Sequence, residues 1–151
     1  MAEHTESSTV VAAPADRVME VIADLPAYPE WNDEVREVEV LETGEGGRPR
    51  RVRFVLDAGA VRDQYVLAYA WEPRTVRWSL VEGQVLKAME GSYALHERDG
   101  GTEVVYRLSV DVKIPMLGMI KRKAEKVIVE RALAGLRERA ERPAGQPPAG
   151  A

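Results

Sequence analysis

Apolar and polar residues alternate with a period of two through most of the middle of the chain. Such alternation is typical of strands that bury one face. The alternating runs, with a short polar-to-apolar run before them, lie at residues 5–12, 35–40, 51–57, 61–71, 76–80, 89–95 and 104–110. Turn-forming segments separate them, among them TGEGGRP and Asp99-Gly100-Gly101. Because the connections are short, we predict an antiparallel meander.

Helical spacing first appears just after the initial strand. Pro14 suits a first helical position, and Val18, Met19 and Ile22 share one face before Pro26 ends the helix. The next segment, AYPEW, contains Pro29 and predicts a turn or one short helical turn that ends at Trp31. We therefore expect two short helices between the first strand and the second.

The longest helical pattern covers residues 116–142, and its apolar stripe rotates along the helix. One face carries Met116, Ile120, Ala124 and Val127, and another carries Val129, Leu133 and Leu136. If the first face meets the sheet, Arg131 lies within it and can pair with a carboxylate or a ligand anion. If the second face meets the sheet, Arg131 is solvated, which is the arrangement that we favour.

These elements predict an α+β fold with a single domain over residues 1–142. A seven-stranded antiparallel sheet with one apolar face needs a cover, and only the long C-terminal helix can lie across it. Residues 143–151, PAGQPPAGA, cannot build a core and predict a disordered tail.

The composition excludes several kinds of site. The chain has 151 residues and no cysteine, which excludes disulfides, thiol catalysis and thiolate metal sites and favours a reducing, cytoplasmic location. With only His4 and His96, we expect no multi-histidine metal site and no cofactor. We expect no signal peptide, and no apolar run is long enough to span a bilayer.

Charge is distributed unevenly along the chain. The net charge is −4, which gives no case for a nucleic-acid partner. Residues 1–112 carry 12 basic and 21 acidic side chains, whereas residues 113–142 carry 9 basic and 4 acidic ones. The basic C-terminal segment favours an anionic ligand or surface, and the alternative is a solvated helix face.

Sequence motifs for catalysis are missing. No serine lies in a G-x-S-x-G motif, and TGEGGRP leads into a strand and lacks the lysine of a phosphate loop. Glu37, Glu39 and Glu42 alternate outward, and we expect rim positions for Asp63 and His96. We therefore assign no catalytic residue.

The inward phase of the strands carries six large aromatic residues, four of them tyrosines: Phe54, Tyr65, Tyr69, Trp78, Tyr93 and Tyr106. A buried tyrosine hydroxyl needs a partner, so we predict a ligand pocket of about 300–1,000 Å³; the alternative is that some tyrosines reach the rim. Gly91 suits the bend of such a sheet, although a plain bulge explains it equally well. The predicted ligand-binding residues are Phe54, Leu56, Tyr65, Leu67, Tyr69, Trp78, Leu80, Met89, Tyr93, Tyr106, Leu108, Met116, Ile120, Ala124 and Val127.

The start of the long helix combines apolar and basic residues. The apolar residues lie within 116–120, and Lys121, Arg122, Lys123 and Lys126 follow. We interpret this junction as a portal whose cations attract an acidic ligand head or an anionic surface. The alternative is an ordinary core contact with solvated bases.

The order of these elements resembles the helix-grip fold of the START-like, or SRPBCC, superfamily. Within it, the chain resembles the polyketide cyclase/dehydrase and lipid-transport group over residues 5–141. The segments that carry the resemblance are APADRVMEVIADLPAYPEW, VRWSLVEG with LKAMEGSYAL, GGTEVVYRLSVDVKIP and VIVERALAGLRERAE. The resemblance implies a curved seven-stranded sheet wrapped around the C-terminal helix.

The resemblance also implies an internal cavity for a small hydrophobic or amphipathic molecule, such as a lipid, a quinone or a polyketide-like ring system. The chain would then be a carrier or sensor. The alternative is a polyketide aromatase/cyclase or dehydratase that uses cavity tyrosine, arginine and serine groups, and a third interpretation is a partner-binding module. We expect a monomer or dimer without an integral membrane segment, in transient contact with an anionic surface.

Overall fold

The computed structural model describes residues 4–57, 62–113 and 117–142. The predicted tail at 143–151 and the predicted site residue Met116 lie outside these ranges. In chain order the elements are β1 (Thr5–Val11), α1 (Ala15–Ala23), η1 (Leu25–Ala27), α2 (Tyr28–Trp31), β2 (Val35–Thr43), η2 (Glu45–Gly47), β3 (Pro49–Asp57), β4 (Arg62–Trp71), β5 (Thr75–Gly83), β6 (Leu86–Arg98), β7 (Gly101–Val112) and α3 (Gly118–Glu141).

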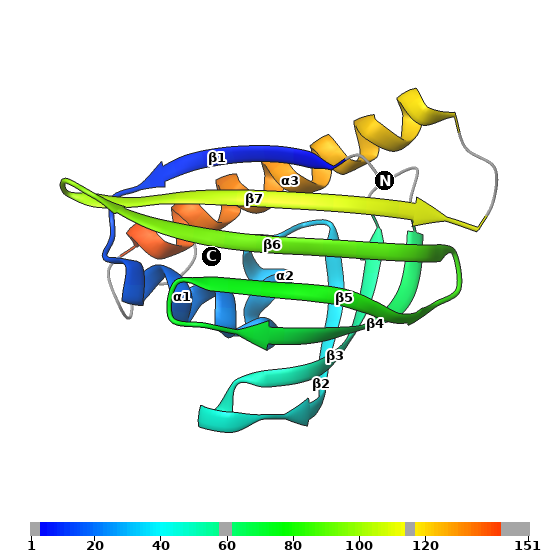
Figure 1. The fold of residues 1–151 in the computed structure, drawn as a ribbon, viewed down its shortest axis with the longest axis horizontal. Coiled ribbons are helices and arrows are strands. Elements are labelled where there is room, and N and C mark those ends of the chain that lie inside the picture. The colour runs from blue at the N-terminus through cyan, green and yellow to red at the C-terminus, as the bar shows by residue number, and fades with distance from the viewer. Residues whose placement is uncertain (1–3, 58–61, 114–116, 143–151) are drawn as a thin grey trace.

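The strands form one antiparallel, seven-stranded sheet in the order β1-β7-β6-β5-β4-β3-β2. Strands β2 to β7 are a meander, as predicted, and β1 closes the sheet beside β7. Figure 1 shows the sheet curving, with β2 and β3 bending along their length. The predicted α+β class with a curved sheet and a long C-terminal helix is confirmed.

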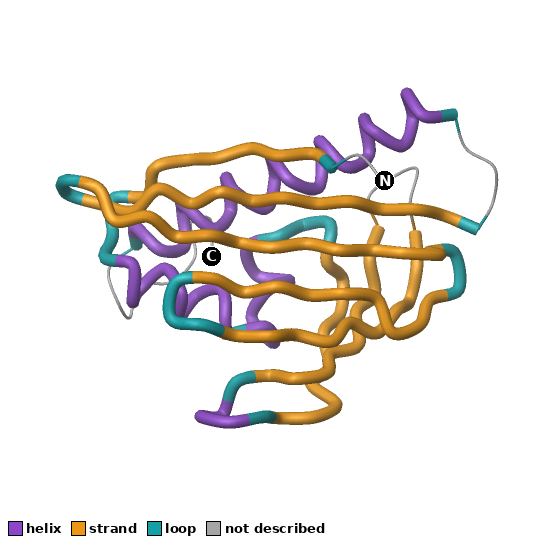
Figure 2. Tube along the Cα trace, viewed as in Figure 1, coloured by secondary structure: helices purple, strands orange, loops and turns teal. Residues whose placement is uncertain are grey.

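The three α-helices lie on one face of this sheet (Figure 2). Helix α1 begins after Pro14, which has an extended conformation, and it buries Val18, Met19 and Ile22. Pro26 cannot extend an α-helix with a normal hydrogen bond, and the chain continues there as the short 3-10 turn η1. No helix in the described ranges is both long and apolar enough to cross a membrane.

Helix α3 meets the sheet through the second of its two predicted faces. Its buried residues are Ala124, Glu125, Ile128, Val129, Ala132, Leu133, Leu136 and Ala140. The stripe that we predicted to line the cavity is therefore only partly inside: Ala124 is buried, Val127 is half-buried and Ile120 is 44% exposed. Ile128, Ala132 and Ala140, which neither predicted face included, are buried beside the second face and widen it.

Two contacts fix α3 in this position. The buried Glu125 carboxylate accepts hydrogen bonds from the Val110 N–H at 2.7 Å and from the Thr5 hydroxyl at 2.9 Å, which ties the helix to β7 and β1. At Gly135 the helix passes so close to α2 that a Cβ would overlap the Trp31 carbonyl oxygen. A glycine is therefore required at the crossing of α2 and α3.

Candidate functional site

Five neighbouring strands place large aromatic side chains on the sheet face that α3 covers. Phe54 from β3 stacks on Tyr65 from β4, with ring centroids 5.5 Å apart. Trp78 from β5 lies 5.4 Å from Tyr93 of β6, which lies 4.6 Å from Tyr106 of β7. The six aromatics that the pattern places on the inward phase thus form one continuous cluster.

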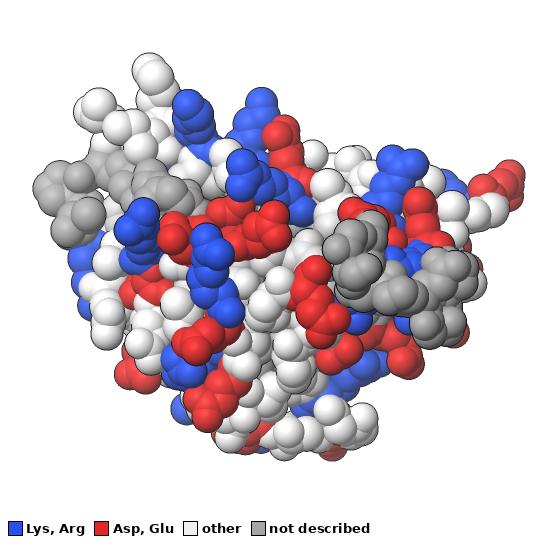
Figure 3. All heavy atoms as spheres, turned by 180° about the vertical axis from the view of Figure 1, so that it is seen from behind, with Lys and Arg blue, Asp and Glu red and all other residues white. Residues whose placement is uncertain are grey.

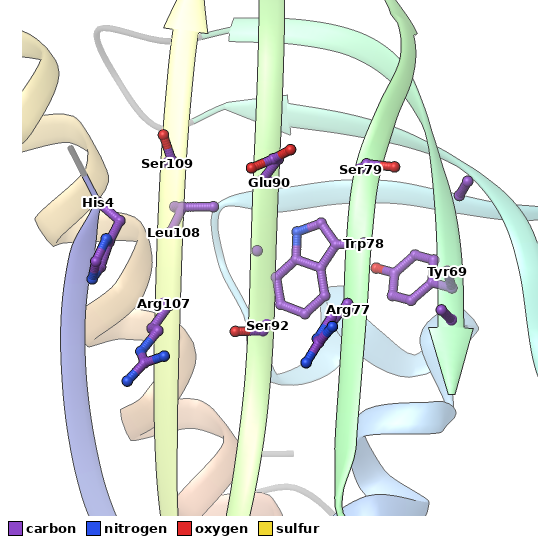
Figure 4. A pocket seen from close by; sticks show the side chains of 13 residues that line it. His4, Tyr69, Arg77, Trp78, Ser79, Glu90, Ser92, Arg107, Leu108 and Ser109 are labelled. Atoms are coloured by element: carbon purple, nitrogen blue, oxygen red, sulfur yellow. The ribbon is translucent and has the colours of Figure 1, made fainter. Parts of the chain in front are cut away.

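Gly91 makes room for the central ring of this cluster. The sheet register places Gly91 of β6 directly opposite Trp78 of β5, and Figure 4 shows the indole reaching toward β6. A Cβ at Gly91 would overlap the indole ring atoms. Because Gly91 has no side chain, the indole of Trp78 can pack directly on the backbone of β6 at this position.

A small cavity of about 50 Å³ remains between the aromatic face and the helices. The cavity that the described residues line is therefore smaller than the predicted range of about 300–1,000 Å³. The reason is that the rings pack against one another and fill most of the space. The lining residues are Tyr28, Asn32, Val35, Phe54, Leu56, Tyr65, Leu67, Tyr69, Trp78, Met89, Tyr93, Tyr106, Leu108 and Ile128.

Ten of the predicted ligand-binding residues are among these, all from strands β3 to β7. Four other predicted residues do not line the cavity. Leu80 is half-buried and packs against the core, and the remaining three are Ile120, Ala124 and Val127 of α3. Instead the helix contributes Ile128, which lies between the two faces that the sequence pattern distinguishes.

Sequence reasoning also missed the contribution of α2. Tyr28 and Asn32 line the cavity, followed by Val35 at the start of β2. The pattern predicted AYPEW as a turn or one short helical turn and gave no direction for its side chains. The signal that was available is the spacing of Tyr28 and Asn32, which are four residues apart and so lie on the same side of a helical turn.

Most tyrosine hydroxyls in this interior are unpartnered. The Tyr28 hydroxyl donates to the Ile22 carbonyl oxygen. Within the described residues, no hydrogen-bond partner is present for the hydroxyls of Tyr65, Tyr69, Tyr93 and Tyr106. Three of these four residues are at most 6% exposed. Their hydroxyl oxygens still reach accessible space at the cavity, because the one fully buried side-chain nitrogen or oxygen without a partner among the described residues is Nε1 of Trp31.

Asn32 adds a further polar group to the lining. Asn32 is only 6% exposed, and its Oδ1 atom accepts a hydrogen bond from the backbone N–H of Glu34 at 3.2 Å. Its amide NH₂ group has no partner among the residues that the structure describes. The carboxamide is thus fixed at its oxygen and free to donate at its nitrogen.

Burial keeps these phenols neutral. Desolvation raises the pKa of Tyr65, Tyr93 and Tyr106 above the ordinary tyrosine value, and it does the same for Tyr69 and Tyr28. Neighbouring tyrosines raise the pKa of most of them further, because two phenolates in one apolar space repel each other. The hydroxyls therefore act as hydrogen-bond donors at neutral pH.

Two of the residues singled out as candidate charged groups have structural partners. Arg131 is 62% exposed at its side chain and pairs with the buried carboxylate of Glu34, so it is both solvated and paired. Asp63 is buried, not at the rim as we predicted. Its carboxylate accepts the backbone N–H groups of Gln84 at 3.0 Å and Leu86 at 2.8 Å, which holds the turn from β5 to β6.

The opposite face of the sheet carries an open groove of about 710 Å³ (Figure 4). Small side chains from β4 to β7 form its floor, and Arg77, Glu90 and Arg107 border it. Arg107 pairs with Glu6 of β1. The described residues hold no group of three or more histidines, aspartates or glutamates that could bind a metal ion.

Comparison with known families gives one match over almost the whole chain. A family described as "Polyketide cyclase / dehydrase and lipid transport" matches residues 2–141. A comparison with curated proteins gave no match.

Several solved structures are similar to this one. A START superfamily protein from Mycobacterium smegmatis is 23% identical, with a TM-score of 0.83 over 91% of this chain and 97% of that chain. The ZhuI aromatase/cyclase from Streptomyces sp. R1128 is 24% identical, with a TM-score of 0.79 over 97% of this chain and 100% of that chain. A protein from Thermus thermophilus is 28% identical, with a TM-score of 0.78 over 91% of this chain and 97% of that chain. The first two likenesses establish the shared fold.

Proposed function

The chain belongs to the polyketide cyclase/dehydrase and lipid-transport family, and we propose that it is a carrier for a small, ring-bearing apolar molecule with several acceptor oxygens. The proposed site is the interior between the aromatic face of the sheet and the helices. The ligand class follows from the two kinds of group that line this interior, apolar rings and neutral donors.

The observation that carries the proposal is the set of unpartnered donors in an apolar space. The hydroxyls of Tyr65, Tyr69, Tyr93 and Tyr106 and the amide NH₂ of Asn32 can all donate, and none of them makes a hydrogen bond to another described residue. A buried donor without a partner costs about 1–3 kcal/mol. A ligand with carbonyl or phenolic oxygens on an aromatic scaffold supplies the acceptors and stacks on the rings.

The same lining favours binding over proton-transfer catalysis. The polar side chains in it are neutral phenols and one carboxamide, and among described residues no carboxylate or imidazole lines the cavity. Removing a proton from a ligand needs a group with a pKa near the working pH, whereas the pKa of each of these phenols is raised. A neutral phenol can still polarise a carbonyl, which keeps cyclase or dehydratase activity, as named for the Streptomyces relative, as the second candidate.

A ring-bearing ligand needs more room than the cavity has. A volume of about 50 Å³ is enough for one or two water molecules. We therefore propose that the ligand takes the place of ring-to-ring contacts, so that aromatic side chains turn as it enters. Binding would then change the fluorescence of Trp78 and the near-ultraviolet circular dichroism of the tyrosines.

The test compares two probes of similar shape, a hydroxylated anthraquinone and the hydrocarbon anthracene. Titrations are followed by tryptophan fluorescence in the parent, Tyr93→Phe and Tyr106→Phe. Each Phe variant removes one hydroxyl and keeps the ring. We expect the anthraquinone to bind more weakly by about 2- to 12-fold for a hydroxyl that it contacts, with anthracene unchanged.

Tyr28→Phe is the matched control, because the Tyr28 hydroxyl already donates to the Ile22 carbonyl. It is expected to lower stability and to leave the preference between the two probes unchanged. The proposal fails if the parent binds neither probe, or if Tyr93→Phe and Tyr106→Phe keep the parent's preference for the anthraquinone. Turnover of an added poly-ketone in the parent would instead favour the second candidate.

A further inference from the structure

The start of α3 presents three apolar side chains to solvent. Leu117 is 73% exposed, Met119 is 76% exposed and Ile120 is 44% exposed. We call these three residues the apolar tip. They lie where the helix extends beyond β1, at a corner of the molecule (Figure 1). Large apolar residues grouped at a protruding corner are uncommon on a surface that faces only water.

Basic side chains follow the apolar tip at once. Lys123 is exposed, and the Lys126 side chain is 68% exposed with Glu130 3.9 Å away. Lys121 is 28% exposed and pairs with Asp111 at 3.3 Å. The acidic residue within this turn, Glu125, is buried and hydrogen-bonded to β1 and β7, so it does not offset these charges at the surface. Figure 3 shows uncharged atoms protruding at this corner with blue side chains beside them.

We propose that the apolar tip inserts into the headgroup region of an anionic lipid bilayer, with Lys123 and Lys126 held against the lipid phosphates. Apolar side chains followed along the helix by lysines match the boundary between acyl chains and charged headgroups. Lysine suits this role because its stem follows the apolar layer while its ammonium group stays at the polar surface. Each lysine near such a surface strengthens binding about fivefold.

A lipid surface fits the shape of this corner better than a protein partner does. A stable protein interface buries about 800 Å² on each partner, whereas the apolar tip is three side chains on a convex corner. A bilayer accepts a protruding wedge without a complementary pocket. This proposal does not depend on the interior ligand, since the contact needs only residues of the helix surface.

The test is co-sedimentation with two kinds of vesicle, phosphatidylcholine alone and phosphatidylcholine mixed with phosphatidylglycerol. We expect the parent to bind the mixed vesicles at low salt and to lose most binding at about 1 M salt, where the screening length falls to about 3 Å. Leu117→Ser with Met119→Asp should reduce binding at least tenfold. Lys123→Gln with Lys126→Gln should reduce it about 25-fold at low salt.

Matched controls come from exposed residues elsewhere on the molecule. Leu41 is 49% exposed on β2, and Arg77 is exposed on the outer face of the sheet. Leu41→Ser and Arg77→Gln should bind as the parent does, and all variants should keep the parent's Tm. The proposal is overturned if the parent ignores the mixed vesicles, if it binds both kinds of vesicle equally, or if the tip variant binds unchanged. Binding to an acidic protein with no binding to vesicles would also overturn it.

Discussion

Gly135→Ala tests how α3 is held over the aromatic face. A methyl group there overlaps the carbonyl oxygen of Trp31 and lies 3.0 Å from the Cε3 atom of the same residue. The oxygen belongs to the backbone of α2, so it cannot swing aside as the end of a long side chain would. The helix must therefore move away from α2, and Ile128, which α3 places at the cavity, must move with it.

Two opposing effects set the size of the change. Gly→Ala in an unobstructed helical position stabilises a protein by about 0.4–1 kcal/mol, because the unfolded chain loses freedom. Overpacking a tight contact costs about 1–3 kcal/mol. The overlap with backbone decides the sign here, and we expect a net loss of roughly 1–2 kcal/mol, or roughly 2–8 °C in Tm for a chain of this size.

Gly118→Ala is the matched control on the same helix. The nearest atom that its methyl group would meet is Nη1 of Arg122 at 3.6 Å, an ordinary contact. We expect Gly118→Ala to hold or slightly raise the Tm. Thermal unfolding followed by circular dichroism measures both variants, with urea titrations to obtain free energies. If Gly135→Ala raises the Tm as much as Gly118→Ala does, the close crossing of α2 and α3 is wrong.

Two further predictions concern pH and the β5–β6 turn. All five tyrosines have a folded pKa raised by burial above 10.0, so their stabilising effect is present below about pH 10 and is lost as pH rises. Above about pH 10 the free energy of unfolding should fall by up to about 1.4 kcal/mol per pH unit for each tyrosine. In an alkaline titration, tyrosinate absorbance should rise at the same pH at which circular dichroism is lost. Phenols that ionise one by one while the circular dichroism stays that of the folded chain would contradict this prediction. Asp63→Asn turns one acceptor of the buried carboxylate into a donor that faces the Leu86 N–H. This change should lower the free energy of unfolding by about 1–3 kcal/mol. The control Asp99→Asn, at an exposed position, should change the free energy of unfolding by less than about 0.5 kcal/mol.

The sequence pattern was a good guide to the strands because their periodicity is set by burial on one face. The inward phase of Phe54, Tyr65, Trp78, Tyr93 and Tyr106 follows from a period of two alone. The volume that these rings leave does not follow from it, because it depends on how the side chains of different strands pack together. That is why the cavity that the described residues line is smaller than the predicted one.

The helices were harder to orient from the pattern. The stripe on α3 rotates, so both faces were consistent with the sequence, and the favoured face is the one that the structure buries. Asp63 shows a different limit. Its partners Gln84 and Leu86 are about twenty residues away in the chain, and the position beside a strand start gave no sign of the N–H groups that bury it. Tyr28 and Asn32 were missed because a four-residue helix has too few positions for a periodic signal.

The most direct test of the central claim is the position of a bound ring ligand, measured by nuclear Overhauser effects to side-chain methyl groups. The methyl groups of Met89 and Ile128 line the interior cavity, whereas those of Ala68 and Ala70 line the groove on the opposite face. With a hydroxylated anthraquinone bound, we predict contacts from the ring protons to Met89 and Ile128 and none to the two alanines. Contacts to Ala68 and Ala70 without contacts to Met89 and Ile128 would contradict the account, because the ligand would then lie outside the aromatic interior.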